Sequence, residues 1–301
     1  MIILRLEDLS KSFGNHQIID GVNLEIDAHK IYGFIGPNGS GKTTTIKMIL
    51  GLLKADRGSI SLMGQKVKYG DMVTNQEVGY LPDVPEYYAY MNAREYLELC
   101  AGLIVQGKQT ASIDDLLNKV GITDDKLLIS KYSRGMKQRL GIAQALINQP
   151  KLLICDEPTS ALDPKGRQDI LQILQEVKKE TTVIFSTHIL SDVERICDEV
   201  LVLTHQNIRN LKDIEQDLAD RKNRIMISLM VEPVDEERLA KKYKLRKANQ
   251  LVTIEIPIQK FEKTEIAVKA CLNDLIEMEI YPSYFEVVDR SLEDLYIEVV
   301  S

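Results

Sequence analysis

Eight consecutive residues near the N-terminus have the composition of a loop that binds phosphate groups. The run is Gly36-Pro37-Asn38-Gly39-Ser40-Gly41-Lys42-Thr43, and Thr44 follows it. Its glycines let the backbone turn successive N–H groups inward, toward phosphate oxygens. Lys42 supplies positive charge to the β- and γ-phosphates, and the Thr43 hydroxyl can complete a Mg²⁺ shell. The pattern therefore predicts a site for a nucleoside triphosphate with Mg²⁺.

Two adjacent acids, Asp156 and Glu157, follow the apolar run Leu152–Cys155. A carboxylate at the C-terminal end of a buried strand stands where a Mg²⁺ ligand is needed beside a phosphate loop, so we assign that role to Asp156. Glu157 comes next, and we expect it to polarise a water for in-line attack on the γ-phosphorus. Together with the phosphate loop, these acids predict hydrolysis of the triphosphate.

Three further motifs complete a recognisable order along the chain. They are Tyr132-Ser133-Arg134-Gly135-Met136-Lys137-Gln138-Arg139-Leu140, Ser160-Ala161-Leu162-Asp163 and Ser186-Thr187-His188. With the phosphate loop before all three and the carboxylate pair between the first and the second, the chain resembles the nucleotide-binding subunit of ABC transporters over residues 2–210. The resemblance implies an ATPase that binds ATP and Mg²⁺ and closes as a head-to-tail dimer.

The resemblance also implies roles for single residues. Ser133 and Gly135 would cap the phosphates bound by the opposite subunit, with Asp163 also at the nucleotide. His188 would contact the γ-phosphate and share catalysis with Lys42 and Glu157. Phe13 aligns with the aromatic residue that stacks on adenine, a role that needs only a flat face.

Two motifs depart from the family pattern. The motif Tyr132–Leu140 corresponds to the signature sequence of the family, and we call it the signature. It keeps Ser133 and Gly135 but has tyrosine, arginine and methionine at three other places. Asp83 stands where the family usually has glutamine, as a Mg²⁺ ligand near the attacking water. Aspartate is shorter, adds a negative charge and lacks a donor, yet it can still bind Mg²⁺ directly or through water.

Tyrosines 87, 88 and 90 follow Asp83 directly. Either they pack within a helical subdomain, or they line a groove for a short helix of a membrane partner. The sequence favours neither interpretation.

The signature variant resembles that of bacterial exporter ATPases for drugs and peptides, and so does the ending Ser291–Tyr296. The resemblance implies a separate transmembrane permease, a homodimer or pseudo-symmetric heterodimer of ATPase subunits, and a peripheral place on the cytoplasmic face of the membrane. Two alternatives stay open: an importer ATPase, and an ABC ATPase acting on DNA or ribosomes. The latter is disfavoured because no heptad run separates Lys42 from Ser133.

Short apolar strands alternating with helices must position these residues. We expect strands at Ile31–Ile35, Leu152–Cys155, Thr182–Ser186 and Val200–Leu203, and helices at Thr43–Leu50, 92–120, Ser133–Ile147, Pro164–Lys179 and Leu190–Ile196. Such alternation predicts a parallel sheet covered on both faces. The fold class is therefore α/β: a P-loop ATPase cassette with a mixed sheet and a helical subdomain, plus a small C-terminal α+β domain.

The expected domains are residues 1–210, with the helical subdomain at about 84–150, and residues 211–301. The second domain should contain strands from Met226, at Leu251–Ile256 and at Tyr284–Val288, with helices at Asp235–Tyr243, Phe261–Met278 and Leu292–Val299. His205–Asn223, polar and charged, is the expected linker.

Net charge, cysteine content and the length of apolar stretches exclude several classes of protein. The net charge is -7, which argues against a nucleic-acid partner. The chain has 4 cysteines without a CxxC pair, which excludes a disulfide scaffold or a zinc ribbon. No apolar stretch is long enough to span a bilayer, so the transport pathway must lie in another chain.

Overall fold

The computed structural model describes residues 1–71, 74–104, 110–123, 126–204, 206–214, 224–248, 251–257, 264–288 and 296. The chain divides into two compact units, Met1–Leu211 and Lys212–Val299. Each unit has its own hydrophobic core. We describe them one at a time.

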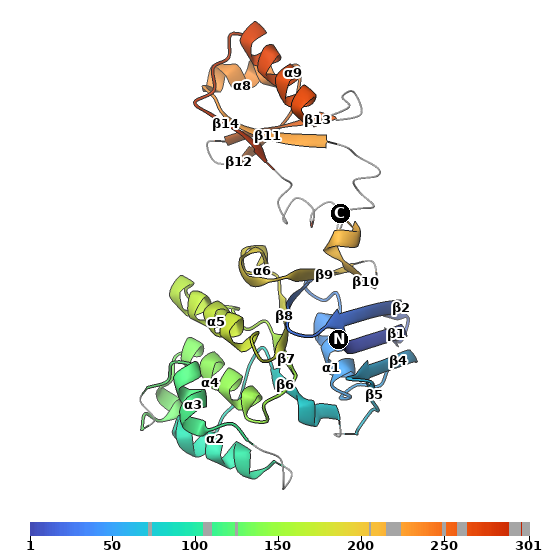
Figure 1. Ribbon diagram of the computed structural model, residues 1–301, viewed down its shortest axis with the longest axis vertical. Coiled ribbons are helices and arrows are strands. Elements are labelled where there is room, and N and C mark those ends of the chain that lie inside the picture. Colours follow the sequence, from blue (N-terminus) through green and yellow to red (C-terminus); the bar gives the residue numbers. More distant parts are fainter. Residues whose placement is uncertain are drawn as a thin grey trace. The chain divides into compact units, whose positions relative to one another are not determined.

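A six-stranded sheet forms the centre of the first unit (Figure 1), in the order β10-β9-β3-β8-β7-β6. Its strands are β3 (Ile31–Ile35), β6 (Val78–Leu81), β7 (Leu152–Asp156), β8 (Thr182–Thr187), β9 (Glu199–Thr204) and β10 (Asn207–Asn210). β10 pairs antiparallel with β9, and the other pairs are parallel. The mixed sheet confirms the α/β class and the strands expected from the apolar runs.

Register within this sheet aligns three strand ends at one edge. Ile35, the last residue of β3, pairs with Thr187, and Asp156, the last residue of β7, pairs with Ser186. Loops that leave these strands therefore begin side by side. This edge is where an open parallel sheet places its ligand site.

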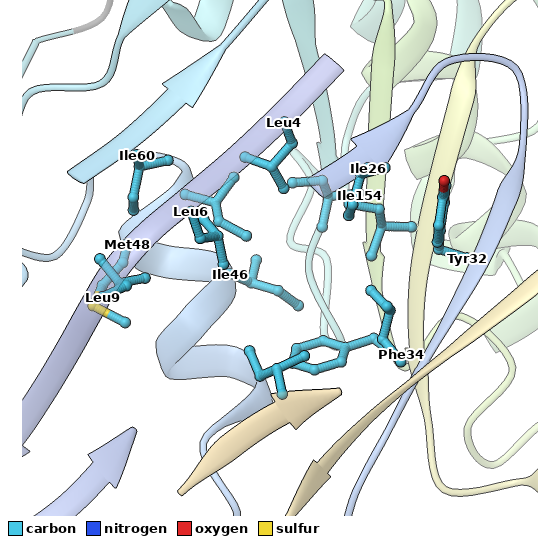
Figure 2. Packing of buried hydrophobic residues seen from close by; sticks show 14 of the residues in the cluster. Leu4, Leu6, Leu9, Ile26, Tyr32, Phe34, Ile46, Met48, Ile60 and Ile154 are labelled. Atoms are coloured by element: carbon cyan, nitrogen blue, oxygen red, sulfur yellow. The ribbon is translucent and has the colours of Figure 1, made fainter. Parts of the chain in front are cut away.

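An antiparallel sheet in the order β2-β1-β4-β5 packs beside the central one. Its strands are β1 (Ile2–Phe13), β2 (His16–Asp27), β4 (Arg57–Leu62) and β5 (Gln65–Lys66). Figure 2 shows the core between them, where side chains of β1, such as Leu4 and Leu6, meet Ile46 of the first helix and Ile154 of β7. This packing anchors the phosphate-loop helix on its inner face.

The helices of the first unit follow the expected positions with one exception. They are α1 (Lys42–Ile49), α2 (Ala93–Gly102), α3 (Ile113–Lys119), α4 (Arg134–Leu146), α5 (Pro164–Val177) and α6 (Leu190–Ile196), with 3₁₀ turns η1 (Thr74–Glu77) and η2 (Ile129–Lys131). The single helical stretch expected at 92–120 is wrong, because α2 ends at Gly102 and α3 begins anew after its N-cap Ser112.

Helix caps are set locally. The Asn92 side chain accepts a hydrogen bond from the Glu95 backbone N–H, and the Glu95 carboxylate accepts one from the Asn92 backbone N–H, which is a full capping box. α2, α3 and α4 contact one another, and α4 packs on β6 at the rim of the central sheet (Figure 1). The signature segment is thereby carried on a helix that rests directly on the sheet.

Over residues 224–248, 251–257 and 264–288, the second unit is a four-stranded antiparallel sheet with two helices. Its elements are β11 (Arg224–Met230), α8 (Pro233–Ala240), β12 (Lys244–Ala248), β13 (Leu251–Pro257), α9 (Thr264–Glu277) and β14 (Tyr284–Val288). The order β12-β13-β11-β14 with this alternation is the split βαβ, ferredoxin-like arrangement. It confirms an α+β unit. The helix expected at Leu292–Val299 lies outside the described residues, except for Tyr296. The linker expected at His205–Asn223 is wrong in its first part, because Asn207–Asn210 forms β10 and pairs with β9, while residues 215–223 lie outside the described residues.

Candidate functional site

The phosphate loop connects β3 to α1. Gly39 and Gly41 both have positive φ angles, +79° and +111°, which side chains other than glycine rarely adopt. A Cβ on Gly41 would lie 2.3 Å from Cγ2 of Ile18, so β2 packs directly against the loop. The Ser40 hydroxyl is buried and has no hydrogen-bond partner among the described residues. A buried donor of this kind needs an acceptor, which a phosphate oxygen can supply.

Lys42 is the first residue of α1, and its side chain is buried under the loop. The Nζ atom donates to the backbone carbonyls of Gly36 at 2.8 Å and Pro37 at 3.4 Å, and it lies 3.9 Å from Oε1 of Glu157. Burial lowers the pKa of Lys42, an effect that the charges of Glu157 and Asp156 oppose. The neighbouring carboxylates thus help to keep the ammonium charged.

Asp156 ends β7 and is almost fully buried. Its Oδ2 accepts a hydrogen bond from Oγ1 of Thr43 at 2.7 Å, and its Oδ1 accepts one from Oγ of Ser186 at 2.5 Å. The strand register explains both contacts, because β7 and β8 pair at Asp156 and Ser186 and α1 packs on β7. The hydroxyl oxygen of Thr43 and a carboxylate oxygen of Asp156 therefore lie side by side in the site.

Glu157 leaves the strand in a strained conformation, with φ of +51°. The left-handed region costs a residue with a side chain about 1–2 kcal/mol. The backbone N–H of Glu157 donates to both the carbonyl and the hydroxyl oxygen of Ser186, each at 3.1 Å. This anchorage turns the side chain toward Lys42 and His188, and Nδ1 of His188 lies 2.9 Å from Oε2 of Glu157.

Burial raises the pKa of the Glu157 carboxyl, and the nearby His188 and Lys42 act in the opposite direction. A carboxylate with a raised pKa is a better proton acceptor than an exposed one. His188 itself is half-exposed at the mouth of the site. Glu157, His188 and Lys42 are thus brought into one contact network.

Other residues singled out in the sequence lie outside this network in the single chain. Ser133 is the N-cap of α4 and accepts from the Met136 N–H at 3.2 Å, while Asp163 caps α5 through the Gly166 N–H at 3.3 Å. Gly135 faces the side chain of Leu162, just before Asp163. Thr44 is partly exposed on α1. The first turn of α4 and the Asp163 turn therefore lie close together on the surface.

Asp83 is tied to α4. The Nε2 atom of Gln138 donates to the Asp83 carbonyl at 2.9 Å, and Nη2 of Arg134 lies 3.7 Å from Oδ1 of Asp83. Next to it, the Tyr87 hydroxyl donates to the Lys137 carbonyl at 2.6 Å. The loop after β6 is thus fastened to the first turns of α4.

The three tyrosines 87, 88 and 90 differ in how far they are buried, which bears on whether they pack within the helical subdomain or line a groove for a partner. Tyr87 packs edge-on against Tyr96 with centroids 5.1 Å apart, and burial raises its pKa well above its usual range. The side chains of Tyr88 and Tyr90 are 53% and 71% exposed. Tyr87 is therefore part of the packing, and only the other two are available to a partner.

Sequence reasoning missed two residues of this site. Ser186 holds Asp156 and the backbone of Glu157, and the buried Gln138 holds the Asp83 loop. Ser186 could have been found as a polar residue at the end of an otherwise apolar strand. Nothing in the local sequence marks Gln138 as buried.

The sequence pattern of the ABC transporter family matches residues 19–160. The chain is 37% identical over 303 residues to the uncharacterized ABC transporter ATP-binding protein YxlF of Bacillus subtilis (strain 168), covering 99% of each chain. It is 38% identical over 239 residues to the bacitracin transport ATP-binding protein BcrA of Bacillus licheniformis, covering 75% of this chain and 78% of the relative. A solved ATP-binding subunit of an ABC transporter superposes with a TM-score of 0.63 at 30% identity, covering 72% of this chain and 93% of that one.

Among the described residues, no helix combines the length and the apolar character that a bilayer crossing demands. The Bacillus subtilis relative, which aligns along nearly the whole chain, and the solved ATP-binding subunit indicate the same family. The chain belongs to the ABC transporter family of ATPases, as an ATP-binding subunit.

Proposed function

We propose that this subunit hydrolyses ATP through the network of Lys42, Glu157 and His188 and drives a separate transmembrane permease that exports a drug, peptide or similar compound. The observation that carries the proposal is that Glu157 lies within contact distance of both Lys42 and His188. A phosphate-binding cation and a proton acceptor at this spacing suit in-line attack on a γ-phosphate.

Each residue of the network has a distinct task. The N–H groups of the phosphate loop and Lys42 bind the β- and γ-phosphates. Glu157 takes a proton from the attacking water, and its raised pKa supports that role. His188 orients the Glu157 carboxylate through Nδ1, which leaves its other nitrogen free to face the γ-phosphate.

The residues present also fit a Mg²⁺ ion. Thr43 and Asp156 offer hydroxyl and carboxylate oxygens 2.7 Å apart, and Mg²⁺ in nucleotide sites takes one or two such protein ligands with phosphates and waters. When bound, Mg²⁺ would neutralise charge that develops on the phosphate oxygens. Asp83 is a third proposed ligand, and its contacts to α4 would require its loop to turn toward the nucleotide.

Ser133, Gly135 and Asp163 have a role only in a dimer. The Ser133 N-cap leaves an exposed helix N-terminus at α4, a favourable place for an anion. We propose that it caps ATP held by a second ATPase subunit, identical to this one or paralogous. Closing on two ATP molecules would store the conformational difference that hydrolysis releases.

The permease and the direction of transport rest on similarity. The Bacillus licheniformis relative is named for bacitracin transport, and the signature variant resembles that of exporter ATPases. We infer that this chain sits peripherally on the cytoplasmic face of the membrane. The exposed pair Tyr88 and Tyr90, with ring centroids 5.8 Å apart, is the proposed contact for the permease.

Two substitutions test the chemistry. Glu157→Gln should retain ATP binding and lose about a thousandfold in kcat, the scale of general-base catalysis. Lys42→Ala should abolish tight ATP binding. The control Lys47→Ala removes an exposed lysine from the same helix and should match wild type. Wild-type turnover in Glu157→Gln would refute the assignment of the proton acceptor.

The partner is tested with the same variant. Tagged Glu157→Gln protein is captured from membranes in mild detergent with Mg²⁺ and ATP. Recovery of a multi-span membrane protein in near-equal amount would support the transporter subunit. Recovery of ribosomes or DNA-binding proteins would favour the alternative ATPase class.

A further inference from the structure

A lysine lies against the ring of Phe13. The Nζ atom of Lys11 is 5.1 Å from the centroid of this ring, within the range of a cation–π contact. Lys11 is buried, whereas Phe13 is 51% exposed. One face of the aromatic ring is therefore covered by an ammonium group, while the ring still presents a large open surface.

Asp56 fixes this arrangement from the neighbouring strand end. Its Oδ1 accepts a hydrogen bond from Nζ of Lys11 at 2.8 Å, and its Oδ2 accepts one from the backbone N–H of Ser12 at 2.8 Å. A single carboxylate thus holds both the lysine and the backbone that leads into Phe13. The hydrogen bond from Lys11 is the main reason that the pKa of Asp56 is lowered, as expected for a well-formed ion pair.

The hairpin that carries Phe13 packs against the phosphate loop. Phe13 pairs with His16 at the tip of the β1–β2 hairpin. Two residues further along, Ile18 contacts Gly41 of the phosphate loop so closely that no Cβ would fit there. A nucleotide whose phosphates lie in the loop can therefore place its base on the open face of Phe13.

The covered face changes what the open face can bind. Aromatic faces carry negative charge density, and two such faces repel when they stack. A cation behind one ring draws that density away and so favours stacking of an electron-rich purine on the other side. Because Asp56 pre-orders Lys11, ATP binding does not have to immobilise this flexible side chain.

We propose that Lys11 and Asp56 are positioning residues that set the affinity for the purine base by holding a cation on the far face of Phe13. The inference rests on the proposed ATP site and adds to it a determinant of base affinity. Removing the cation should weaken binding of nucleotides and leave binding of the bare phosphate chain intact.

The test compares Lys11→Met, Lys11→Arg and Asp56→Asn by titration calorimetry with ATP and with inorganic tripolyphosphate. Methionine keeps the apolar stem of lysine without its charge, and arginine restores a cation over the ring. Lys66→Met, on the exposed strand β5, is the matched control.

We expect Lys11→Met to weaken ATP binding about fivefold, the scale of a partly exposed cation–π contact. Tripolyphosphate binding should stay within about twofold. Asp56→Asn should act in the same direction, Lys11→Arg should restore affinity, and the KM for ATP should change more than kcat.

Three results would overturn the proposal. Unchanged ATP affinity would show that the cation does not matter, and tighter binding would show that Lys11 obstructs the face used by the base. Equal weakening of ATP and tripolyphosphate would indicate a general effect on the fold or charge. Failure of the proposed ATP site itself is distinguishable, because wild-type protein would then bind neither ligand.

Discussion

Replacing Ser186 by alanine removes one oxygen atom from the centre of the site. Ser186 is fully buried, and its Oγ donates to Asp156 Oδ1 at 2.5 Å while accepting from the Glu157 N–H at 3.1 Å. The Glu157 N–H keeps its second acceptor, the Ser186 carbonyl. The Asp156 oxygen loses its hydroxyl donor in a place where little water can reach it.

The expected cost follows from these contacts. A hydrogen bond to a charged group contributes about 1.5–3 kcal/mol, and leaving a buried acceptor unsatisfied costs a similar amount. The retained Thr43 bond to the other carboxylate oxygen holds the Asp156 side chain in place. We therefore expect Ser186→Ala to lower the free energy of unfolding by about 2 kcal/mol. For a unit of this size, that corresponds to about 4–8 °C in Tm.

The assay is urea unfolding followed by circular dichroism, since the chain has no tryptophan. Ser59→Ala is the matched control, because the Ser59 hydroxyl donates to Glu7 at 2.9 Å in a solvent-exposed position. Its cost should stay within about 0.5 kcal/mol. If Ser186→Ala and Ser59→Ala destabilise equally, the argument that burial makes the Ser186–Asp156 bond valuable is refuted.

Two further predictions concern the same site. Because burial raises the pKa of Glu157 and His188 opposes that effect, ATP turnover should fall as pH drops through this raised pKa. His188→Ala should move the acid limb of the pH–rate profile to higher pH, and an unmoved limb would contradict the contact. Gly39→Ala meets no atom within 4 Å and should cost about 1 kcal/mol for its backbone conformation alone. Gly41→Ala adds the clash with Ile18 and should lower Tm at least twice as far in thermal denaturation.

Much of the fold follows from local sequence. Ile31–Ile35 and Leu152–Asp156 are apolar runs bounded by glycine or acids, and both are buried parallel strands. Asn92 and Ser133 are strong N-caps and do begin helices. In each case, propensity, patterning and capping agree with the tertiary structure, so sequence alone was sufficient.

Where these signals were weak, the prediction failed. β12, Lys244–Ala248, has the polar sequence KLRKA and was not predicted as a strand, because its only large apolar residue is Leu245. It forms through pairing with β13, a contact that its own sequence does not reveal. The break between α2 and α3 was missed because a helical pattern was extended across Gly102.

The candidate site residues show the same contrast between features that local sequence reveals and features that depend on tertiary contacts. The phosphate loop and the acids were recognised from their order in the chain, while the orientation of Glu157 depends on a left-handed backbone angle and two bonds to Ser186. These hydrogen bonds depend on the register between β7 and β8, which pairs Asp156 with Ser186. The local sequence of either strand does not reveal that register.

Asp83 shows why a motif position and its surroundings must be considered together. In the proposed Mg²⁺-binding role, aspartate in place of the usual glutamine would bring a negative charge toward the phosphates, which alone would oppose ATP binding. Here the same chain has arginine at position 134, 3.7 Å from that carboxylate, and Gln138 holds the adjoining carbonyl. Two departures from the family pattern therefore face each other across one contact. The charge that Asp83 introduces is balanced by the charge that Arg134 adds to the signature helix.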